Sequence, residues 1–220
     1  MRLVADNLGI SRGSKQVIGG CSFSLSAGEA LAVTGPNGAG KSSLLRGIAG
    51  LLPLNAGRVA LEAASEVSVA EQAHYVGHAN ALKPSLTARE NLDFWAALLA
   101  APAGEKGRPA IEALAAFGLA YIADLPCAYL SAGQKRRTAL ARLLVAPRPL
   151  WLLDEPAAGL DTASQALLEA TIGAHLARGG LVVAALHAPL DIGPARELAI
   201  AGASPGLATG ALAPASAGWA

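Results

Sequence analysis

The sequence predicts an α/β fold with a parallel sheet, because apolar runs typical of buried strands alternate with patterns typical of helices. Three runs lack polar alternation and span residues 31–34, 150–153 and 181–186. Such runs are typical of strands that are covered on both faces. Leucine and isoleucine residues recur at helical spacing after the first run, at 44–48, and after the second, at 168–176.

The segments around these runs predict the other elements. Residues 1–30 alternate loosely and contain glycine turns, so we expect an antiparallel edge sheet there. Residues 59–75 indicate a further strand followed by a loop. Residues 84–147 are mostly helical in pattern, and Thr87 and Glu90 form a capping box at the first of these helices.

Composition excludes several classes of protein. Hydrophobic residues make up 53% of the 220 residues and charged residues 15%, so most of the chain is not disordered. The formal net charge of +1 lacks the basic excess of a nucleic-acid-binding protein. Cys21 and Cys127 form no CxxC pair, which excludes a disulfide scaffold and fits a reducing cytoplasm. No uncharged apolar run reaches the ~18 residues of a membrane-spanning helix, and we expect no secretory signal.

A glycine-rich segment with the sequence GPNGAGKS follows the first apolar run and precedes a helix, and it fits the phosphate-binding pattern GxxxxGK[ST]. Backbone amides of such a loop point at nucleotide phosphates, and the helix N-terminus adds partial positive charge. We expect Lys41 to reach the β- and γ-phosphates and Ser42 to ligate Mg²⁺. A chance glycine-rich turn is disfavoured by the flanking strand and helix. The candidate nucleotide-binding residues are Gly35, Pro36, Asn37, Gly38, Ala39, Gly40, Lys41, Ser42 and Ser43.

Acidic residues end the second apolar run. Because parallel sheets bind ligands at the carboxyl ends of their strands, Asp154 and Glu155 should face the glycine-rich loop. Asp154 suits the Mg²⁺ shell, and Glu155 suits polarisation of an attacking water. Taken alone, acids after a strand are more often part of a solvated turn, but the glycine-rich loop favours the first interpretation here. His187 follows the third run and is either a surface group or a hydrogen-bond donor to the γ-phosphate.

A second helix start also favours anion binding. Ser131 and Gln134 form a capping box before a strongly helical segment. The Ser131 hydroxyl, the Gly133 amide and the helix N-terminus together form a second candidate phosphate site. The alternative is a well-capped helix with no ligand.

These segments together resemble the ATP-binding subunit of an ABC transporter. GPNGAGKSS matches the Walker A motif of that family, LSAGQ the signature motif and LWLLDEP the Walker B motif. Asp161 matches the D-loop aspartate, and His187 matches the switch histidine. The motifs occur in the order of the family over about residues 1–200, and five motifs in order are very specific.

The resemblance implies a P-loop NTPase of the ABC type. The expected fold is a RecA-like core with an antiparallel β subdomain and a helical subdomain. The ATP-binding domain would span 1–200, the helical subdomain about 83–147, and a flexible Ala/Gly/Pro-rich tail 201–220. The resemblance also implies a homodimer that forms on ATP binding. Each ATP would lie between Walker A of one protomer and Ser131, Gly133, Gln134 and Asp161 of the other.

Three positions depart from the family pattern. Arg12 stands where the family has an aromatic residue that stacks on adenine, and its guanidinium plane can take that role. His78 stands where the family has the Q-loop glutamine, which contacts Mg²⁺ and water; we therefore assign it as a candidate catalytic residue and metal ligand. Ala158 replaces the D-loop serine and removes a hydroxyl.

These departures narrow the resemblance from the whole ABC family to one subfamily. YVGHANALKPSLTARENLDFW and LSAGQKRRTALARL look like the ATP-binding subunit of the bacterial cytochrome c maturation haem exporter. This implies a peripheral protein at the cytoplasmic face of the inner membrane that binds hydrophobic permease subunits, with no nucleic acid partner. Haem would not bind this chain directly, and His74, His78 and His175 are interpreted as structural or nucleotide-side residues.

The permease contact is expected at about residues 77–99. Phe94, Trp95, Leu98 and Leu99 supply apolar area there, and the alternative is that they pack the helical subdomain. Three other functions stay open: an ABC transporter with another cargo, a soluble ABC ATPase in DNA repair or ribosome function, and a non-hydrolysing ABC protein. The presence of one Walker A motif and the absence of a heptad run disfavour the soluble ABC ATPase. Glu155 disfavours the non-hydrolysing ABC protein.

Overall fold

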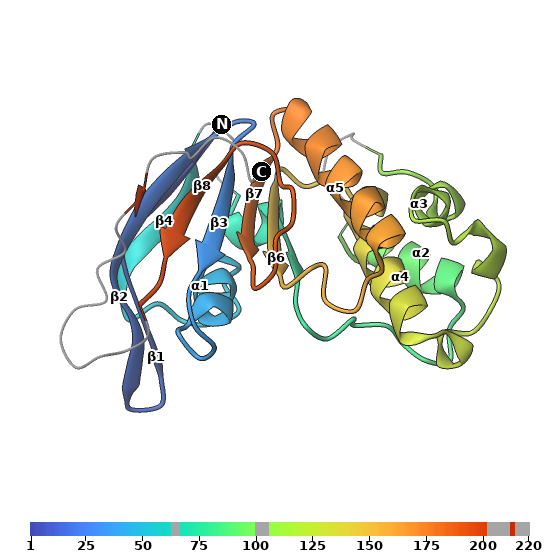
Figure 1. The fold of residues 1–220 in the computed structure, drawn as a ribbon, viewed down its shortest axis with the longest axis horizontal. Helices are drawn as coiled ribbons and strands as arrows, with labels where there is room; N and C mark the ends of the chain where they lie inside the picture. The colour runs from blue at the N-terminus through green and yellow to red at the C-terminus, as the bar shows by residue number, and fades with distance from the viewer. Residues whose placement is uncertain (63–66, 100–105, 202–211, 214–220) are drawn as a thin grey trace. The chain divides into compact units, whose positions relative to one another are not determined.

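The computed structural model describes residues 1–62, 67–99, 106–201 and 212–213. Two units make up the chain, and each has buried hydrophobic residues of its own (Figure 1). The first unit comprises Met1–Gly77, Pro149–Glu155 and Ile172–Ala220. The second comprises His78–Arg148 and Pro156–Thr171.

A largely parallel sheet belongs to the first unit. Over the described part of the chain, its strands lie in the order β5-β6-β7-β3-β8-β9, and only the β8–β9 pair is antiparallel. Every residue of β6 and β7 is buried, which confirms the prediction of strands covered on both faces. The strands are β3 (Ala30–Thr34), β5 (Ala73–Val76), β6 (Leu150–Asp154), β7 (Leu181–Ala185), β8 (Ala195–Ala199) and β9 (Leu212–Ala213).

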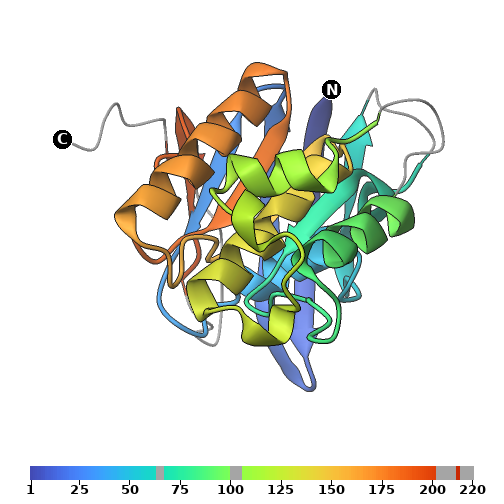
Figure 2. The same ribbon diagram turned by 90° about the vertical axis from the view of Figure 1, so that its right-hand side faces the viewer.

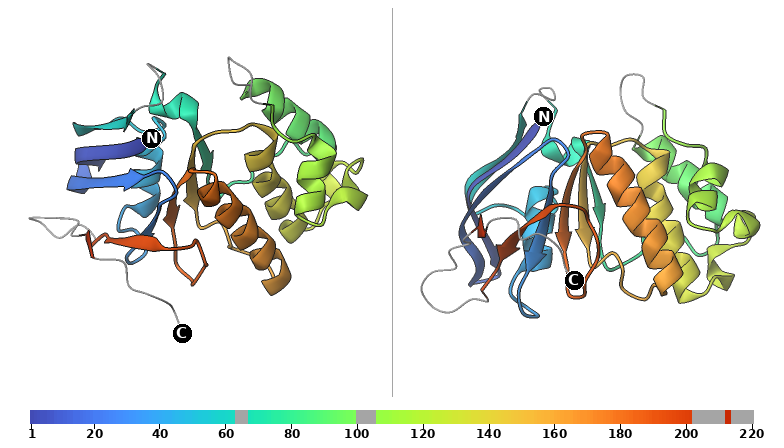
Figure 3. Two further views of the ribbon diagram at one scale, coloured as in Figure 1. Left: turned by 90° about the horizontal axis from the view of Figure 1, so that it is seen from above. Right: turned by 45° about the horizontal axis from the view of Figure 1, so that its top comes forward.

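A second, antiparallel sheet confirms the prediction for residues 1–30. Its order is β2-β1-β4, with β1 (Arg2–Arg12), β2 (Lys15–Ser26) and β4 (Ala56–Glu62). Helix α1 (Lys41–Ile48) contacts β1 and β2 as well as β6 and β7, so it lies between the two sheets (Figure 3). Leu44, Leu45 and Ile48 on α1 join one buried core with side chains from both sheets. This packing fixes the start of α1 relative to the ends of the parallel strands.

The second unit is helical. Figure 2 shows α2 (Ala88–Leu98), α3 (Ala110–Ala116) and α4 (Ala132–Val145) gathered together, and all three pack pairwise. Short 3₁₀ turns, η2 (Ala120–Ile122) and η3 (Cys127–Tyr129), connect α3 to α4. Helix α5 (Thr162–Ala177) begins in this unit, and its last residues belong to the first. Leu92, Leu114, Phe117 and Leu140 are fully buried.

The capping box predicted at the first of these helices is present. The Thr87 hydroxyl accepts a hydrogen bond from the Glu90 amide at 3.1 Å, and the Glu90 carboxylate accepts one from the Thr87 amide at 2.8 Å. The bond from the Thr87 amide, and after it one with the Thr87 side chain, favour the ionised carboxylate and hold the pKa of Glu90 below its usual value. Two amides at the start of α2 are thereby satisfied.

Several strands differ from the sequence expectation. The strand predicted within 59–75 begins earlier, at Ala56, and residues 73–76 form β5 where a loop was expected. Strand β8 was not predicted, because Arg196 and Glu197 interrupt its apolar pattern; hydrogen bonding to β3 makes it a strand.

The predicted flexible tail lies mostly outside the described residues. Within it the structure describes β9, which pairs with β8 in antiparallel register. The domain boundaries that the sequence suggested, 1–200, 83–147 and 201–220, stay predictions.

Candidate active site

The glycine-rich loop connects β3 to α1 in a conformation that requires glycine. Gly35 has a φ of 136° and Gly40 a φ of 108°, both in a region that side chains rarely adopt. A Cβ atom at Gly35 would lie 2.2 Å from the carbonyl oxygen of Ile200, and one at Gly40 would lie 3.0 Å from that of Val17. The loop therefore keeps its shape only with glycine at these two positions.

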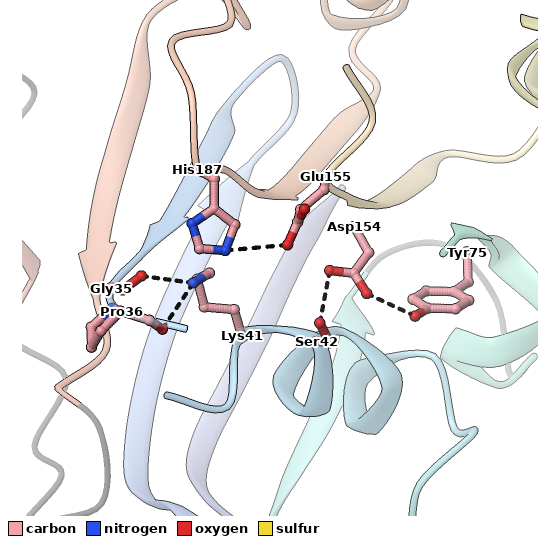
Figure 4. A network of polar contacts seen from close by, with 8 residues as sticks. All are labelled: Gly35, Pro36, Lys41, Ser42, Tyr75, Asp154, Glu155 and His187. Carbon is pink, nitrogen blue, oxygen red and sulfur yellow. Dashed lines mark hydrogen bonds and ion pairs between the residues drawn. The ribbon is translucent and has the colours of Figure 1, made fainter. Parts of the chain in front are cut away.

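The start of α1 is arranged to hold an anion. Gly40 is the N-cap of α1 and, having no side chain, makes no side-chain cap bond to the first amides of the helix. The Lys41 ammonium donates hydrogen bonds to the carbonyl oxygens of Gly35, at 2.6 Å, and Pro36, at 3.1 Å (Figure 4). Lys41 is buried, so its charge lies inside the loop and beside the positive end of the helix. A phosphate group is the ligand that matches this combination.

Ser42 and Asp154 meet at the end of β6. The Ser42 hydroxyl donates a hydrogen bond to Oδ1 of Asp154 at 2.9 Å, and Asp154 is 3% exposed (Figure 4). A hydroxyl and a carboxylate are hard oxygen donors that suit Mg²⁺, which takes few protein ligands and completes its shell with phosphate and water oxygens. Within the described residues no cluster of three or more His, Cys, Asp or Glu side chains could hold a metal by itself. The donor set therefore fits a magnesium ion carried in with a nucleotide.

Glu155 follows β6 in a strained backbone conformation. Its φ of 48° is unusual for a residue with a side chain, and its amide donates to the Ala185 carbonyl at 3.0 Å. Nε2 of His187 lies 3.2 Å from Oε1 of Glu155 (Figure 4). Strain of this kind clusters at functional sites. The structure thus brings Glu155 and His187 together at the carboxyl ends of β6 and β7.

Tyr75 and Arg46 belong to the same group of contacts, and the sequence did not indicate them. The Tyr75 hydroxyl donates to Oδ2 of Asp154 at 3.1 Å and accepts a hydrogen bond from Nε of Arg46 at 3.0 Å. Burial raises the pKa of Tyr75, so the phenol keeps its proton at neutral pH and can donate it. Tyr75 lies opposite Leu152 in the β5–β6 pairing, and that register is the signal that would have identified it.

Arg12 and the remaining loop residues lie in the first unit. Arg12 is the exposed last residue of β1 and pairs with Lys15 across the β1–β2 turn. Pro36 and Asn37 are exposed, whereas Ala39 and Ser43 are buried, as are most residues of α1.

The other predicted residues lie in the second unit. The Ser131 hydroxyl accepts from the Gln134 amide at 3.2 Å, and Oε1 of Gln134 accepts from the Ser131 amide at 2.8 Å. Gly133 lies in the first turn of α4. Oδ1 of Asp161 accepts from the Ser164 amide at 2.8 Å. Hydrogen bonding with the Ser164 side chain, and after it with this amide, lowers the pKa of Asp161. His78 is exposed and directly follows the last residue of the first unit.

Two of the other histidines are buried. His74 is 2% exposed, and His175 is 6% exposed. The His175 ring stacks on Trp151, with ring centroids 3.8 Å apart. Burial is the main reason that the pKa of His175 falls from 6.5 to about 4, so this imidazole is neutral at neutral pH.

A glycine cradle at a helix start, a lysine inside it and two carboxylates at the carboxyl end of β6 in the same sheet define a P-loop ATPase. The model of the ABC transporter family matches residues 18–158, and the chain belongs to that family. This confirms both the predicted fold class and the prediction that the protein is an ATP hydrolase.

Relatives and solved structures agree with this assignment. The chain is 52% identical over 200 residues to the cytochrome c biogenesis ATP-binding export protein CcmA of Chelativorans sp., covering 90% of this chain and 97% of that one. It is 56% identical to the protein of the same name from Rhodopseudomonas palustris, and the match covers 93% of this chain and 100% of that one.

The fold matches solved ABC proteins. A dimeric ATP-binding cassette in a post-hydrolysis state, bound to ADP and Pi, has a TM-score of 0.77 at 23% identity, covering 90% of this chain and 94% of that one. A putative ABC transporter ATP-binding protein from Pyrococcus furiosus has a TM-score of 0.74 at 20% identity, covering 91% and 98%. In the described residues of the present chain, no helix has the length and hydrophobicity needed to cross a membrane.

Proposed function

We propose that this protein is the ATP-binding subunit of a transporter that acts in cytochrome c maturation, where ATP hydrolysis drives haem export or releases a haem–chaperone complex. The observation that carries the proposal is the extent of the similarity to the relatives. Identity of 52% and 56% extends over 90% and 93% of this chain, and both relatives are cytochrome c biogenesis export proteins by name.

Nucleotide binding begins at the glycine-rich loop. The Lys41 ammonium exchanges its contacts with the carbonyls of Gly35 and Pro36 for the β- and γ-phosphates of ATP. The free amides at the start of α1 bind the same phosphates, because they carry partial positive charge and have no side-chain cap. Ser42 and Asp154 would hold Mg²⁺, which would supply charge neutralisation at the phosphate oxygens.

Hydrolysis depends on Glu155 as the general base. Its carboxylate accepts a proton from the attacking water, and the carboxylate is held within hydrogen-bond reach of His187. In this arrangement His187 orients the carboxylate and can donate a hydrogen bond to the γ-phosphate. The strained backbone at Glu155 and the bond from its amide to Ala185 fix the start of the side chain.

Two protomers are proposed to enclose each ATP. The Ser131–Gln134 capping box and the Gly133 amide form a helix start that suits a phosphate, and a two-fold pair brings the helix of one protomer to the loop of the other. Arg12 is proposed to stack on adenine. The roles of His78 and Asp161 stay predictions.

The permease contact is proposed on α2, at the cytoplasmic face of the bacterial inner membrane. Phe94 is 54% exposed and Leu98 is 60% exposed, so these two side chains are accessible to a hydrophobic partner. Trp95 packs within its own unit, where its indole lies under the Arg142 guanidinium at 4.9 Å and donates to the Ala81 carbonyl. The alternative from the sequence, packing of the helical subdomain, fits Trp95, whereas the exposed area of Phe94 and Leu98 supports a permease contact.

Deletion of the gene in its own bacterium tests the proposal. We expect c-type cytochromes to disappear from haem-stained gels, with b-type cytochromes unchanged. A plasmid that encodes the wild-type chain should restore them, and one that encodes Glu155→Gln should not. Exposed Glu62→Gln is the matched control and should restore them fully. Normal c-type cytochromes in the deletion strain would reject this role and leave the ATPase assignment intact.

A further inference from the structure

A chain of hydrogen bonds connects helix α1 to the Walker B carboxylate by a second route. Ser42 and Arg46 are one helical turn apart on α1, so they lie on the same face of the helix. Ser42 contacts Asp154 directly, through Oδ1. Arg46 reaches the other carboxylate oxygen, Oδ2, through the hydroxyl of Tyr75. Both oxygens of Asp154 are thereby held from one helix.

The residue that follows β5 leaves room for this arrangement. Gly77 lies two residues after Tyr75, on the same side of the extended chain. A Cβ atom at Gly77 would lie 2.9 Å from Cε1 and 3.0 Å from the hydroxyl oxygen of Tyr75. Because real Cβ contacts are not that short, a side chain at Gly77 would displace the phenol. Gly77 is therefore part of the reason that Tyr75 reaches Asp154.

The phenol has no freedom to reorient. Its oxygen accepts from Arg46, so its proton points to Asp154. The positive charge of Arg46 polarises the phenol and strengthens the bond that it donates. Asp154 is buried, and a carboxylate bonded through both oxygens keeps one rotamer.

We propose that Tyr75 is a positioning residue for the magnesium site: it holds Asp154 so that Oδ1 faces Ser42. This inference rests on the proposed assignment of Ser42 and Asp154 as Mg²⁺ ligands. Mg²⁺ demands near-ideal octahedral geometry, so a carboxylate that is free to rotate binds it less well. In this role Tyr75 acts through its bond to Asp154 and needs no contact of its own with the nucleotide or the metal.

The proposal predicts a specific defect in Tyr75→Phe. Binding of a non-hydrolysable ATP analogue is measured by calorimetry, once with Mg²⁺ and once with EDTA. We expect Mg²⁺ to strengthen binding about tenfold less in Tyr75→Phe than in the wild type, the size of effect expected for one lost hydrogen bond to a charged group. The affinity in EDTA should be unchanged, because the phosphate contacts of Lys41 and the loop are intact.

Two further variants keep the test decisive. Tyr129→Phe is the matched control, since Tyr129 is 81% exposed, and it should bind as the wild type does in both buffers. Gly77→Ala retains the phenol hydroxyl but displaces the ring, so it should show the same Mg²⁺-specific loss. Added to Tyr75→Phe, it should cause no further loss. If Tyr75→Phe does not fold, Gly77→Ala alone still tests whether Tyr75 positions Asp154.

The outcomes separate this inference from the proposed site. A wild-type response to Mg²⁺ in Tyr75→Phe would overturn the positioning role, as would an equal loss with Mg²⁺ and with EDTA, which indicates general damage to the fold. A wild-type protein whose nucleotide affinity does not respond to Mg²⁺ would instead refute the assignment of Ser42 and Asp154. An intact Mg²⁺ response in Gly77→Ala would contradict the displacement of the phenol.

Discussion

Nε2 of His187 lies 3.2 Å from Oε1 of Glu155, although 32 positions separate the two residues in the sequence. Neighbouring parallel strands explain the contact, because β6 ends at Asp154 and β7 ends at Ala185, directly opposite in register. Each side chain follows its strand by one or two residues. The pair therefore belongs to the edge of the sheet where α/β proteins bind ligands.

Glu155→Gln tests the general base. Glutamine keeps the size and hydrogen-bonding capacity of the side chain but has no basic oxygen with which to accept a proton. We expect ATP binding to persist and turnover to fall at least ~10²-fold, measured as phosphate release from the assembled transporter. Glu62→Gln should retain wild-type turnover. Equal turnover in Glu155→Gln would assign the base to another residue.

Lys41→Ala tests the cationic contact with phosphate. Removing a buried ammonium that pairs with charged oxygens should weaken ATP binding by ~10-fold or more, as measured by calorimetry. Lys15→Ala, at an exposed position of β2, controls for the loss of one positive charge. Retention of wild-type affinity in Lys41→Ala would place the phosphates elsewhere.

The sequence was most informative where local pattern and topology agree. Unbroken apolar runs predicted β6 and β7, and the rule that ligands bind at strand ends placed Asp154 and Glu155 beside the glycine-rich loop. Those inferences need only the order of the elements. The contact between Ser42 and Asp154 at 2.9 Å is therefore foreseeable without coordinates.

The role of Tyr75 was not foreseeable in this way. It depends on the β5–β6 register, which sets Tyr75 opposite Leu152, and on the rotation of α1 that directs Arg46 toward β5. The local hydrophobic pattern of the sequence reveals neither the strand register nor the rotation of the helix. Strand β8 was missed for a related reason. Its pairing with β3 decides its conformation, and its charged residues interrupt the apolar pattern that would have predicted a strand.

Ser131→Ala separates helix capping from nucleotide recognition. Loss of the cap should lower the free energy of unfolding by about 1 kcal/mol, because one amide of α4 loses its acceptor. If Ser131 also contacts the ATP bound by the other protomer, the variant should lose ATP-dependent dimerisation, measured by light scattering in the Glu155→Gln background.

Thr87→Ala is the matched control, because Thr87 caps α2 with the same box. It should lose about as much stability, ~1 kcal/mol, and dimerise normally. Equal dimerisation by the two variants would mean that the Ser131 hydroxyl serves only the helix.

The burial of His175 predicts that the protein loses stability in mild acid. Its imidazole is 6% exposed and stacks on Trp151, and a Cβ at Gly180 would lie 2.2 Å from Nε2. Desolvation by this packing lowers the pKa of His175 to about 4, although hydrogen bonding with the backbone of Leu181 and Pro149 acts in the opposite direction. Below pH 6.5 the unfolded chain therefore binds a proton that the folded chain excludes.

The sign follows from this difference in bound protons. Because the folded pKa of His175 is depressed, stability is retained above pH 6.5 and is lost as pH falls from 6.5 toward about 4. Between about pH 7.5 and about pH 5, protonation of His175 in the unfolded chain should lower the free energy of unfolding by about 2 kcal/mol. Urea unfolding at the two pH values measures this loss. His175→Phe keeps an aromatic ring against Trp151 but cannot take up a proton, so its unfolding free energy should change less over the same interval by that amount. The same pH dependence in both proteins would show that the imidazole is protonated in the folded state.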